Sequence, residues 1–200
     1  MSITVLLLAA GGSTRMRGAD KLLETLEGEP LLRRSARTAL ASHAQETLVV
    51  LGANQSARRV ALEGLPIRIV LNENWQGGMG CSIAAGAAAV ARETRGVMVM
   101  PADMPDLTPA LLNRLIDAMP MDAPQMILRP QTMQGKPGNP VLFGADHIPA
   151  LSALDGDEGA RALLARHRDS IRFIDTGGTA ILTDLDTAQA WATYRDGHKC

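Results

Sequence analysis

The sequence predicts an α/β fold in which a mostly parallel sheet lies between two layers of helices. Over residues 1–124, apolar runs of strand length alternate with segments of helical periodicity. Most of these runs end at glycine or proline, and helical crossovers between strands of one sheet make those strands parallel. The chain has 200 residues, of which 46% are hydrophobic. That is enough for one such domain with a sizeable core.

The first part of the chain alternates strand and helix four times. A continuous apolar run predicts a strand buried on both faces at Ile3–Leu8, and three further strands are predicted at Thr47–Leu51, Ile67–Leu71 and Val97–Met100. Apolar stripes predict helices after Pro30, over Ser56–Glu63, over Cys81–Arg92 and after Thr108. Thr108 is expected to cap the last of these, with Pro109 as its first residue.

The alternation becomes irregular beyond residue 124. Three further strands are predicted, at Met126–Leu128, Val141–Phe143 and Ile171–Asp175. Three helices are predicted, at Ala145–Leu154, at Glu158–His167 behind a cap at Asp157, and at Thr187–Tyr194. We therefore expect one domain over residues 1–200. Residues 1–124 would bind the ligand, and residues 125–200 would form an elaboration over the substrate side with a closing helix.

Composition excludes several classes of function. The formal net charge is −1, so no basic excess exists to bind a nucleic acid. Cys81 and Cys200 are too few for a disulfide framework, which favours a reducing compartment. The N-terminal apolar run has no basic leader and is too short to span a bilayer. We expect a cytoplasmic protein that binds no membrane.

A glycine pair and two cations follow the first predicted strand. Gly11 and Gly12 come directly after it, and Arg15 and Lys21 lie in the same loop. Glycines let backbone N–H groups approach an anion closely, and the cations can neutralise a triphosphate. The loop also leaves the carboxyl edge of the sheet, where ligands bind in such folds. It predicts a phosphate site; the alternative is a tight turn with solvated cations.

Two better-known phosphate motifs do not fit this loop. A dinucleotide-binding fingerprint needs a third glycine where Met16 stands. A P-loop needs Ser or Thr after the lysine, and Leu22 follows Lys21.

Asp103 lies just past the fourth predicted strand, at the same edge of the sheet. A carboxylate in that position suits a hard cation such as Mg²⁺. The alternative is a turn aspartate, because prolines surround it.

Six segments share glycine, asparagine and aspartate patterns with a known family. They are Leu8–Leu23, Asn72–Ser82, Met100–Pro105, Gly135–Phe143, Gly156–Arg161 and Thr183–Thr187. Together they resemble the molybdenum cofactor cytidylyltransferase-like family of molybdopterin nucleotidyltransferases. The resemblance implies a Rossmann-like, three-layer α/β/α sandwich of the nucleotide-diphospho-sugar transferase type. It also implies CMP transfer from CTP to the phosphate of the molybdopterin-bound molybdenum cofactor, with Mg²⁺ as cofactor and pyrophosphate released.

The resemblance assigns roles to individual residues. The catalytic residues would be Arg15, Lys21 and Asp103. The nucleotide would contact Leu8, Ala9, Ala10, Gly11, Gly12, Ser13, Asn72, Gly78 and Ser82. Asn139 and Arg161 would face the acceptor, and the metal would be held by Asp103 with one of Asp184 and Asp186 while the other caps the last helix.

Three positions of the family pattern bear on specificity, and this chain departs from the pattern at two of them. Ala10 is typical of the CTP-using branch, whereas glycine is usual in the GTP-using branch. Arg17 stands where the family mostly has glycine, and Asn139 replaces its histidine.

Three alternatives to this function remain open. GTP could replace CTP in the same reaction. The acceptor could be a sugar, polyol or isoprenoid-precursor phosphate. The protein could instead be a nucleotide-binding molybdenum cofactor chaperone that serves a molybdoenzyme client without turnover. A phosphate acceptor is already anionic, so turnover itself needs positioning and charge neutralisation rather than a strong base.

Overall fold

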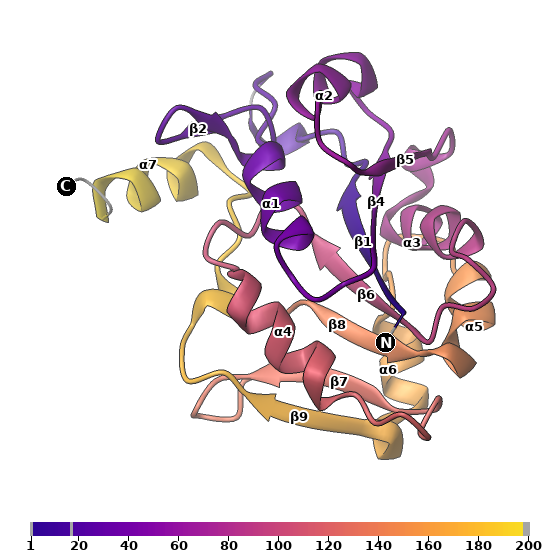
Figure 1. Ribbon diagram of the computed structural model, residues 1–200. Coiled ribbons are helices and arrows are strands. Elements are labelled where there is room, and N and C mark those ends of the chain that lie inside the picture. Colours follow the sequence, from indigo (N-terminus) through magenta and orange to yellow (C-terminus); the bar gives the residue numbers. More distant parts are fainter. Residues whose placement is uncertain (1, 17, 198–200) are drawn as a thin grey trace.

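A seven-stranded sheet forms the centre of the molecule, with helices on both faces (Figure 1). This computed structural model describes residues 2–16 and 18–197, so Arg17 and Cys200 lie outside the described residues. The strands of the sheet are β1 (Ile3–Ala9), β4 (Glu46–Leu51), β5 (Arg68–Leu71), β6 (Gly96–Pro101), β7 (Ile127–Gln131), β8 (Val141–Gly144) and β9 (Ile171–Asp175). The helices are α1 (Leu31–Leu40), α2 (Gln55–Ala61), α3 (Met79–Ala88), α4 (Pro109–Ala118), α5 (Ile148–Ser152), α6 (Arg161–Arg166) and α7 (Ala188–Gly197).

The strand order creates a crevice beside β1. The order is β5-β4-β1-β6-β8-β7-β9, and within the sheet β8 runs against its neighbours β6 and β7. The chain moves from β1 outward through β4 to β5 and then crosses to β6 on the other side of β1. Ligands bind at such a switch point, outside the carboxyl ends of the strands.

The core lies in two layers, one on each face of the sheet. Alternate residues of β1 point to opposite faces, with Val5 in one buried cluster and Leu6 in the other. The first cluster includes Leu32 of α1 and Leu115 of α4, and the second includes Ile83 of α3. This explains why the predicted strands are continuous apolar runs rather than alternating ones. The predicted α/β class and the seven predicted strands are confirmed.

Helix ends agree with the sequence in two places and differ in a third. Thr108 accepts a hydrogen bond from the Leu111 N–H at 3.3 Å, and Thr187 accepts one from the Ala190 N–H at 3.1 Å. The expected cap at Asp157 is wrong. Helix α6 begins at Arg161, after Ala160, and has no side-chain cap. The residues from 155 to 160 form a loop instead, and this frees Asp157 for another role.

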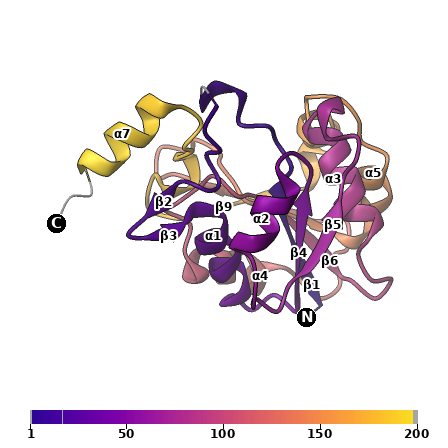
Figure 2. The same cartoon turned by 90° about the horizontal axis from the view of Figure 1, so that it is seen from above.

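A small hairpin and the last helix extend one side of the molecule (Figure 2). The hairpin consists of β2 (Thr25–Leu26) and β3 (Glu29–Pro30), which the sequence analysis did not predict. Arg195 of α7 donates a hydrogen bond to Glu24, just before β2, at 2.8 Å. No helix among the described residues is long and apolar enough to cross a membrane.

Candidate active site

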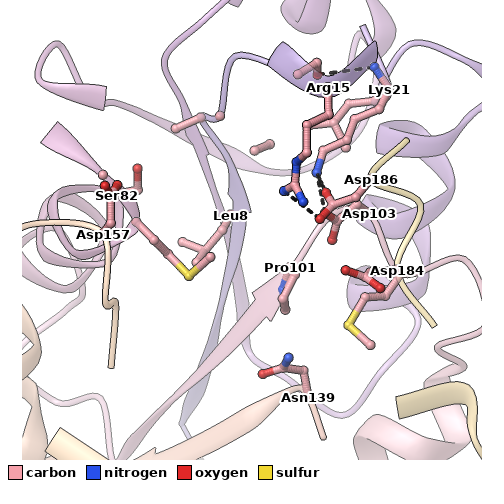
Figure 3. Close-up of a pocket in the computed structure, with 18 of the residues that line it drawn as sticks. Leu8, Arg15, Lys21, Ser82, Pro101, Asp103, Asn139, Asp157, Asp184 and Asp186 are labelled. Carbon is pink, nitrogen blue, oxygen red and sulfur yellow. Dashed lines mark hydrogen bonds and ion pairs between the residues drawn. The ribbon is translucent and has the colours of Figure 1, made fainter. Parts of the chain in front are cut away.

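A cavity of about 700 Å³ opens at the carboxyl ends of β1 and β6 (Figure 3). The glycine-rich loop after β1 forms one wall. The start of α3, the end of β6 and the segments around residues 129–139 and 181–186 form the others. Of the residues predicted for the site, those that line this cavity are Leu8, Ala9, Ala10, Gly11, Gly12, Ser13, Arg15, Lys21, Gly78, Ser82, Asp103, Asn139, Asp184 and Asp186.

Arg58 fixes the glycine-rich loop from behind. Its side chain, on α2, is fully buried and donates hydrogen bonds to the Ala9 carbonyl at 2.7 Å and the Gly11 carbonyl at 2.8 Å. The same guanidinium donates to both carboxylate oxygens of Asp20 at 2.9 Å. Asp20 also accepts from the Ser13 hydroxyl at 3.2 Å. The two ends of the loop are therefore joined through a bidentate ion pair, the strongest common geometry for these groups.

The backbone of the loop is left with free donors. Within residues 2–16 and 18–197, no acceptor is found for the N–H groups of Gly11, Gly12 and Ser13. Donors with no protein partner at the carboxyl edge of a parallel sheet are suited to a phosphate group. The predicted phosphate-binding loop is thus supported by this geometry in addition to the glycine spacing.

The pKa of Asp20 follows from its contacts. Burial by itself would raise the pKa of this carboxyl, but the hydrogen bonds from Arg58 and Asn54 outweigh burial and lower it below its ordinary value. Asp20 is therefore ionised at neutral pH and holds Arg58 in place.

Lys21 lies between two carboxylates from distant parts of the chain (Figure 3). Its Nζ is 2.5 Å from Asp103 Oδ2 and also donates to Asp186 Oδ1. Arg15 binds the other oxygen of Asp186 at 2.7 Å. Burial would lower the pKa of Lys21, but the charges of Asp103 and Asp186 raise it above its ordinary value. Lys21 stays charged, and the predicted catalytic residues Arg15, Lys21 and Asp103 lie in one cluster.

The carboxylates of this cluster suit a hard divalent cation. Among the described residues, no three His, Cys, Asp or Glu side chains form a ready metal cage. Mg²⁺ commonly takes one or two carboxylates and completes its octahedron with water and substrate phosphates. Asp103 and Asp186, which share Lys21, fit that pattern. Asp184 lines the same cavity, and burial and the charges of Asp186 and Asp103 raise its pKa above the ordinary value.

The end of the cavity next to α3 differs from the sequence prediction at one residue. Asn72 is buried and does not line the cavity. It donates from Nδ2 to the Ser82 hydroxyl at 3.1 Å and so positions that side chain. Trp75 lines the cavity against Gly12, where an added Cβ would come within 3.0 Å of the indole ring. Asp157 lines it next to Gly78, whose added Cβ would lie 2.4 Å from Asp157 Oδ1.

The opposite wall carries the predicted acceptor residue Asn139 but not Arg161. Asn139 lines the cavity, whereas Arg161 is exposed at the start of α6 and does not line it. Two cations that the sequence analysis missed, Arg129 and Lys136, lie on this wall.

The missed residues gave little signal in the sequence. Arg58 stands next to Arg59 in a short polar helix, and periodicity cannot say which one turns inward. Arg129 lies in a strand that alternates poorly, and Asp157 resembled a helix cap. Arg129 lies one residue past the predicted strand Met126–Leu128, and only the longer observed strand β7 includes it.

Comparison with known proteins places the chain among nucleotide-handling enzymes. A family model described as MobA-like NTP transferase domain matches residues 5–171. The chain is 32% identical to the nicotine blue oxidoreductase of Paenarthrobacter nicotinovorans, covering 94% of this chain and 93% of that protein. It is 36% identical to the molybdenum cofactor guanylyltransferase of Burkholderia ambifaria strain MC40-6, covering 84% and 83%.

Solved structures share the whole fold. Rv0371c from Mycobacterium tuberculosis H37Rv superposes with a TM-score of 0.85 at 27% identity, covering 98% of both chains. A manganese complex of Rv0371c superposes with a TM-score of 0.81 at 26% identity, covering 96% of this chain and 97% of that one.

Proposed function

We propose a specific reaction for this chain, which belongs to the MobA-like NTP transferase family: transfer of CMP from CTP to the phosphate of the molybdopterin-bound molybdenum cofactor. The chain is a nucleotidyltransferase with the α/β fold of nucleotide-diphospho-sugar transferases. The main structural support for nucleotidyl transfer is that the free loop N–H groups, Lys21 and Asp103 surround one cavity. The related proteins bear different activity names, so the reaction is proposed from the site as well as from the family.

The proposed step needs little covalent help from the protein. An oxygen of the acceptor phosphate attacks the α-phosphorus, the bond from that phosphorus to the bridging oxygen breaks, and pyrophosphate leaves with the bonding electrons. The loop N–H groups, Arg15 and Lys21 bind the triphosphate and neutralise charge on the departing pyrophosphate. The loop is held rigid by Arg58, which favours in-line positioning.

Asp103 and Asp186 would hold Mg²⁺, which supplies charge neutralisation on the triphosphate when bound. Their oxygen donors fit a hard cation, and the manganese complex of the related Rv0371c supports a divalent metal. Lys21 contacts the same two carboxylates, so its ammonium group would lie beside phosphates bound at that site.

The choice of nucleotide sets Ala10 against several relatives named guanylyltransferase. Ala10 supports CTP by family resemblance, and its side chain is buried at the edge of the cavity. The Burkholderia relative is named a guanylyltransferase, which supports GTP. We compare kcat/KM for the two nucleotides; a GTP preference of about tenfold or more, about 1.4 kcal/mol, would reverse our assignment.

The acceptor is tested in the same experiment. The protein is mixed with Mg²⁺, CTP or GTP, and molybdopterin-bound molybdenum, and the product is identified by mass. The expected product is the cytosine dinucleotide form of the cofactor with stoichiometric pyrophosphate. If a product forms with a sugar, polyol or isoprenoid-precursor phosphate but not with molybdopterin, that phosphate is the acceptor. Binding without pyrophosphate release would indicate a chaperone that delivers the cofactor to a molybdoenzyme client. The cytoplasmic location stays a prediction from the sequence.

A further inference from the structure

The cavity wall formed by residues 129–139, here called the acceptor wall, carries cations that have no carboxylate partner. The facing wall, formed by the glycine-rich loop with Lys21 and Asp103, is called the nucleotide wall. There Lys21 is paired with Asp103 and Asp186, and Arg15 with Asp186. Within the part of the chain that the structure describes, Arg129 and Lys136 form no ion pair, although both line the same cavity. Such cations at a cavity wall are available to bind an anionic ligand.

Arg129 is held in a way that leaves its terminal amino groups available. It lies on β7 and is half-buried, and its Nε donates to the Gly138 carbonyl at 3.2 Å. Among the described residues this is the one hydrogen bond its side chain makes. Burial also lowers the pKa of Arg129, because partial loss of water destabilises a charge that no carboxylate offsets. The two terminal amino groups can form the planar fork that binds a phosphate through two parallel hydrogen bonds.

The loop after β7 brings further polar groups to the same wall. It folds back on the strand through hydrogen bonds from the Gly138 N–H to the Pro130 carbonyl at 2.9 Å and from the Thr132 N–H to the Lys136 carbonyl at 2.9 Å. Asn139 follows directly, and Figure 3 shows it on the opposite side of the cavity from the Lys21 cluster. An anion bound at Arg129 would thus face the nucleotide wall across the cavity.

The electrostatics of the proposed reaction require such a site. The acceptor phosphate must approach a triphosphate and the carboxylates Asp103, Asp184 and Asp186, all of them negative. Arg15 and Lys21 contact those carboxylates and, in the proposed reaction, serve the triphosphate. The acceptor therefore needs positive charge that the protein has not already used.

We propose that Arg129, with Lys136 at its side, forms a second anion subsite that binds a phosphomonoester dianion. Its role as the subsite for the acceptor phosphate rests on the proposed function. The binding of a phosphomonoester does not, and this separates the two in experiment.

The direct test measures binding of phenyl phosphate by calorimetry. The protein is first saturated with Mg²⁺ and a non-hydrolysable CTP analogue, so that the glycine-rich loop is already occupied. We expect saturable binding in the wild type, a loss of about tenfold or more in Arg129→Gln, and an intermediate affinity in Arg129→Lys. Arg172→Gln, at an exposed arginine on the adjacent strand β9 that does not line the cavity, is the matched control and should bind as the wild type does.

Kinetics then connect the subsite to turnover. With the acceptor found above, Arg129→Gln should raise the acceptor KM by about tenfold or more and leave the KM for the nucleotide within about twofold. Lys136→Gln, an exposed position where folding is not at risk, should raise the acceptor KM by a smaller factor. Absence of saturable phenyl phosphate binding in the wild type, or equal binding in Arg129→Gln and Arg172→Gln, would overturn the subsite. If no acceptor is used but Arg129→Gln still loses phenyl phosphate, the subsite stands and the proposed function fails.

Discussion

The two walls of the cavity differ in whether their positively charged side chains form ion pairs. On the nucleotide wall, Lys21 is paired with Asp103 and Asp186, and Arg15 is paired with Asp186. Behind that wall, Arg58 is paired with Asp20. On the acceptor wall, Arg129 and Lys136 are unpaired among the described residues. The side-chain cations of the first wall have partners within the protein, whereas those of the second have none among the described residues.

This difference separates the cations that stabilise the fold from those that determine which ligand binds. A buried cation with a carboxylate partner stabilises the local fold only while both partners are present, so its removal exposes an uncompensated charge. A half-exposed cation without a partner contributes little to folding and can be removed at low cost. Substitutions on the nucleotide wall should therefore affect both activity and stability, and those on the acceptor wall should affect activity alone.

The largest effect is expected at the metal-binding end of the nucleotide wall. Asp103→Asn keeps the shape of the side chain but removes the charge that would bind Mg²⁺ and that now pairs with Lys21. We expect kcat to fall by about a thousandfold, comparable with the loss of a strong electrostatic contact in other active sites. Asp122→Asn, at an exposed position on the surface, is the control. Turnover like that of the wild type at saturating Mg²⁺ would remove Asp103 from the mechanism.

Lys21→Ala is expected to have the next largest effect. The truncation removes a charge that would meet the leaving pyrophosphate, and we expect kcat/KM to fall by about 100-fold. It also leaves Asp103 and Asp186 facing one another, so the variant should be less stable than the wild type without metal and should recover in part when Mg²⁺ is added. Thermal unfolding with and without Mg²⁺ is measured alongside steady-state kinetics. Rates and melting temperatures that both match the wild type would mean that the loop does not bind phosphate.

Arg58→Met distinguishes the walls by stability. It leaves Asp20 without its bidentate partner and the Ala9 and Gly11 carbonyls without their donor. We expect a loss of about 3 kcal/mol or more in the free energy of unfolding, together with a raised KM for the nucleotide. The adjacent Arg59→Met, at an exposed position of the same helix, should change the free energy of unfolding by less than about 0.5 kcal/mol. Arg129→Gln should behave like Arg59→Met in urea unfolding, and equal losses at Arg58 and Arg129 would contradict the contrast between the walls.

The smallest effect is a dependence on pH. The folded state lowers the pKa of Asp20, so its contribution to stability is complete above the unfolded aspartate pKa of about 3.9 and is lost as the pH falls through the folded value. The difference in free energy of unfolding between the wild type and Asp20→Asn should therefore be constant near neutral pH. It should shrink as the pH drops below about 4. Urea unfolding of both proteins over that range measures it, and a gap that stays constant to the lowest pH would show that the Asp20–Arg58 pair does not shift the titration.

The sequence by itself determined the class of fold and one wall of the site. Apolar runs predicted the seven strands. The signal is strongest for central strands such as β1 and β4, because a strand buried on both faces excludes polar residues from each face. The glycine pair and Asp103 predicted the phosphate loop and the carboxylate, because both follow strands that end at the same edge of the sheet. Each of these signals is local, because it lies within the strand itself or within a few residues of the strand that it follows.

Tertiary structure alone decided how the charges are paired. Lys21 meets Asp186 across 165 residues of sequence, and Arg58 reaches Asp20 across 38. It also turned Arg58 inward and Arg59 outward, placed Asp157 and Arg129 at the cavity, and left Arg161 outside it. Periodicity reports which face of an element is buried but not which element packs against that face. An ion pair between distant segments becomes visible only when the order of the strands brings those segments to one edge of the sheet.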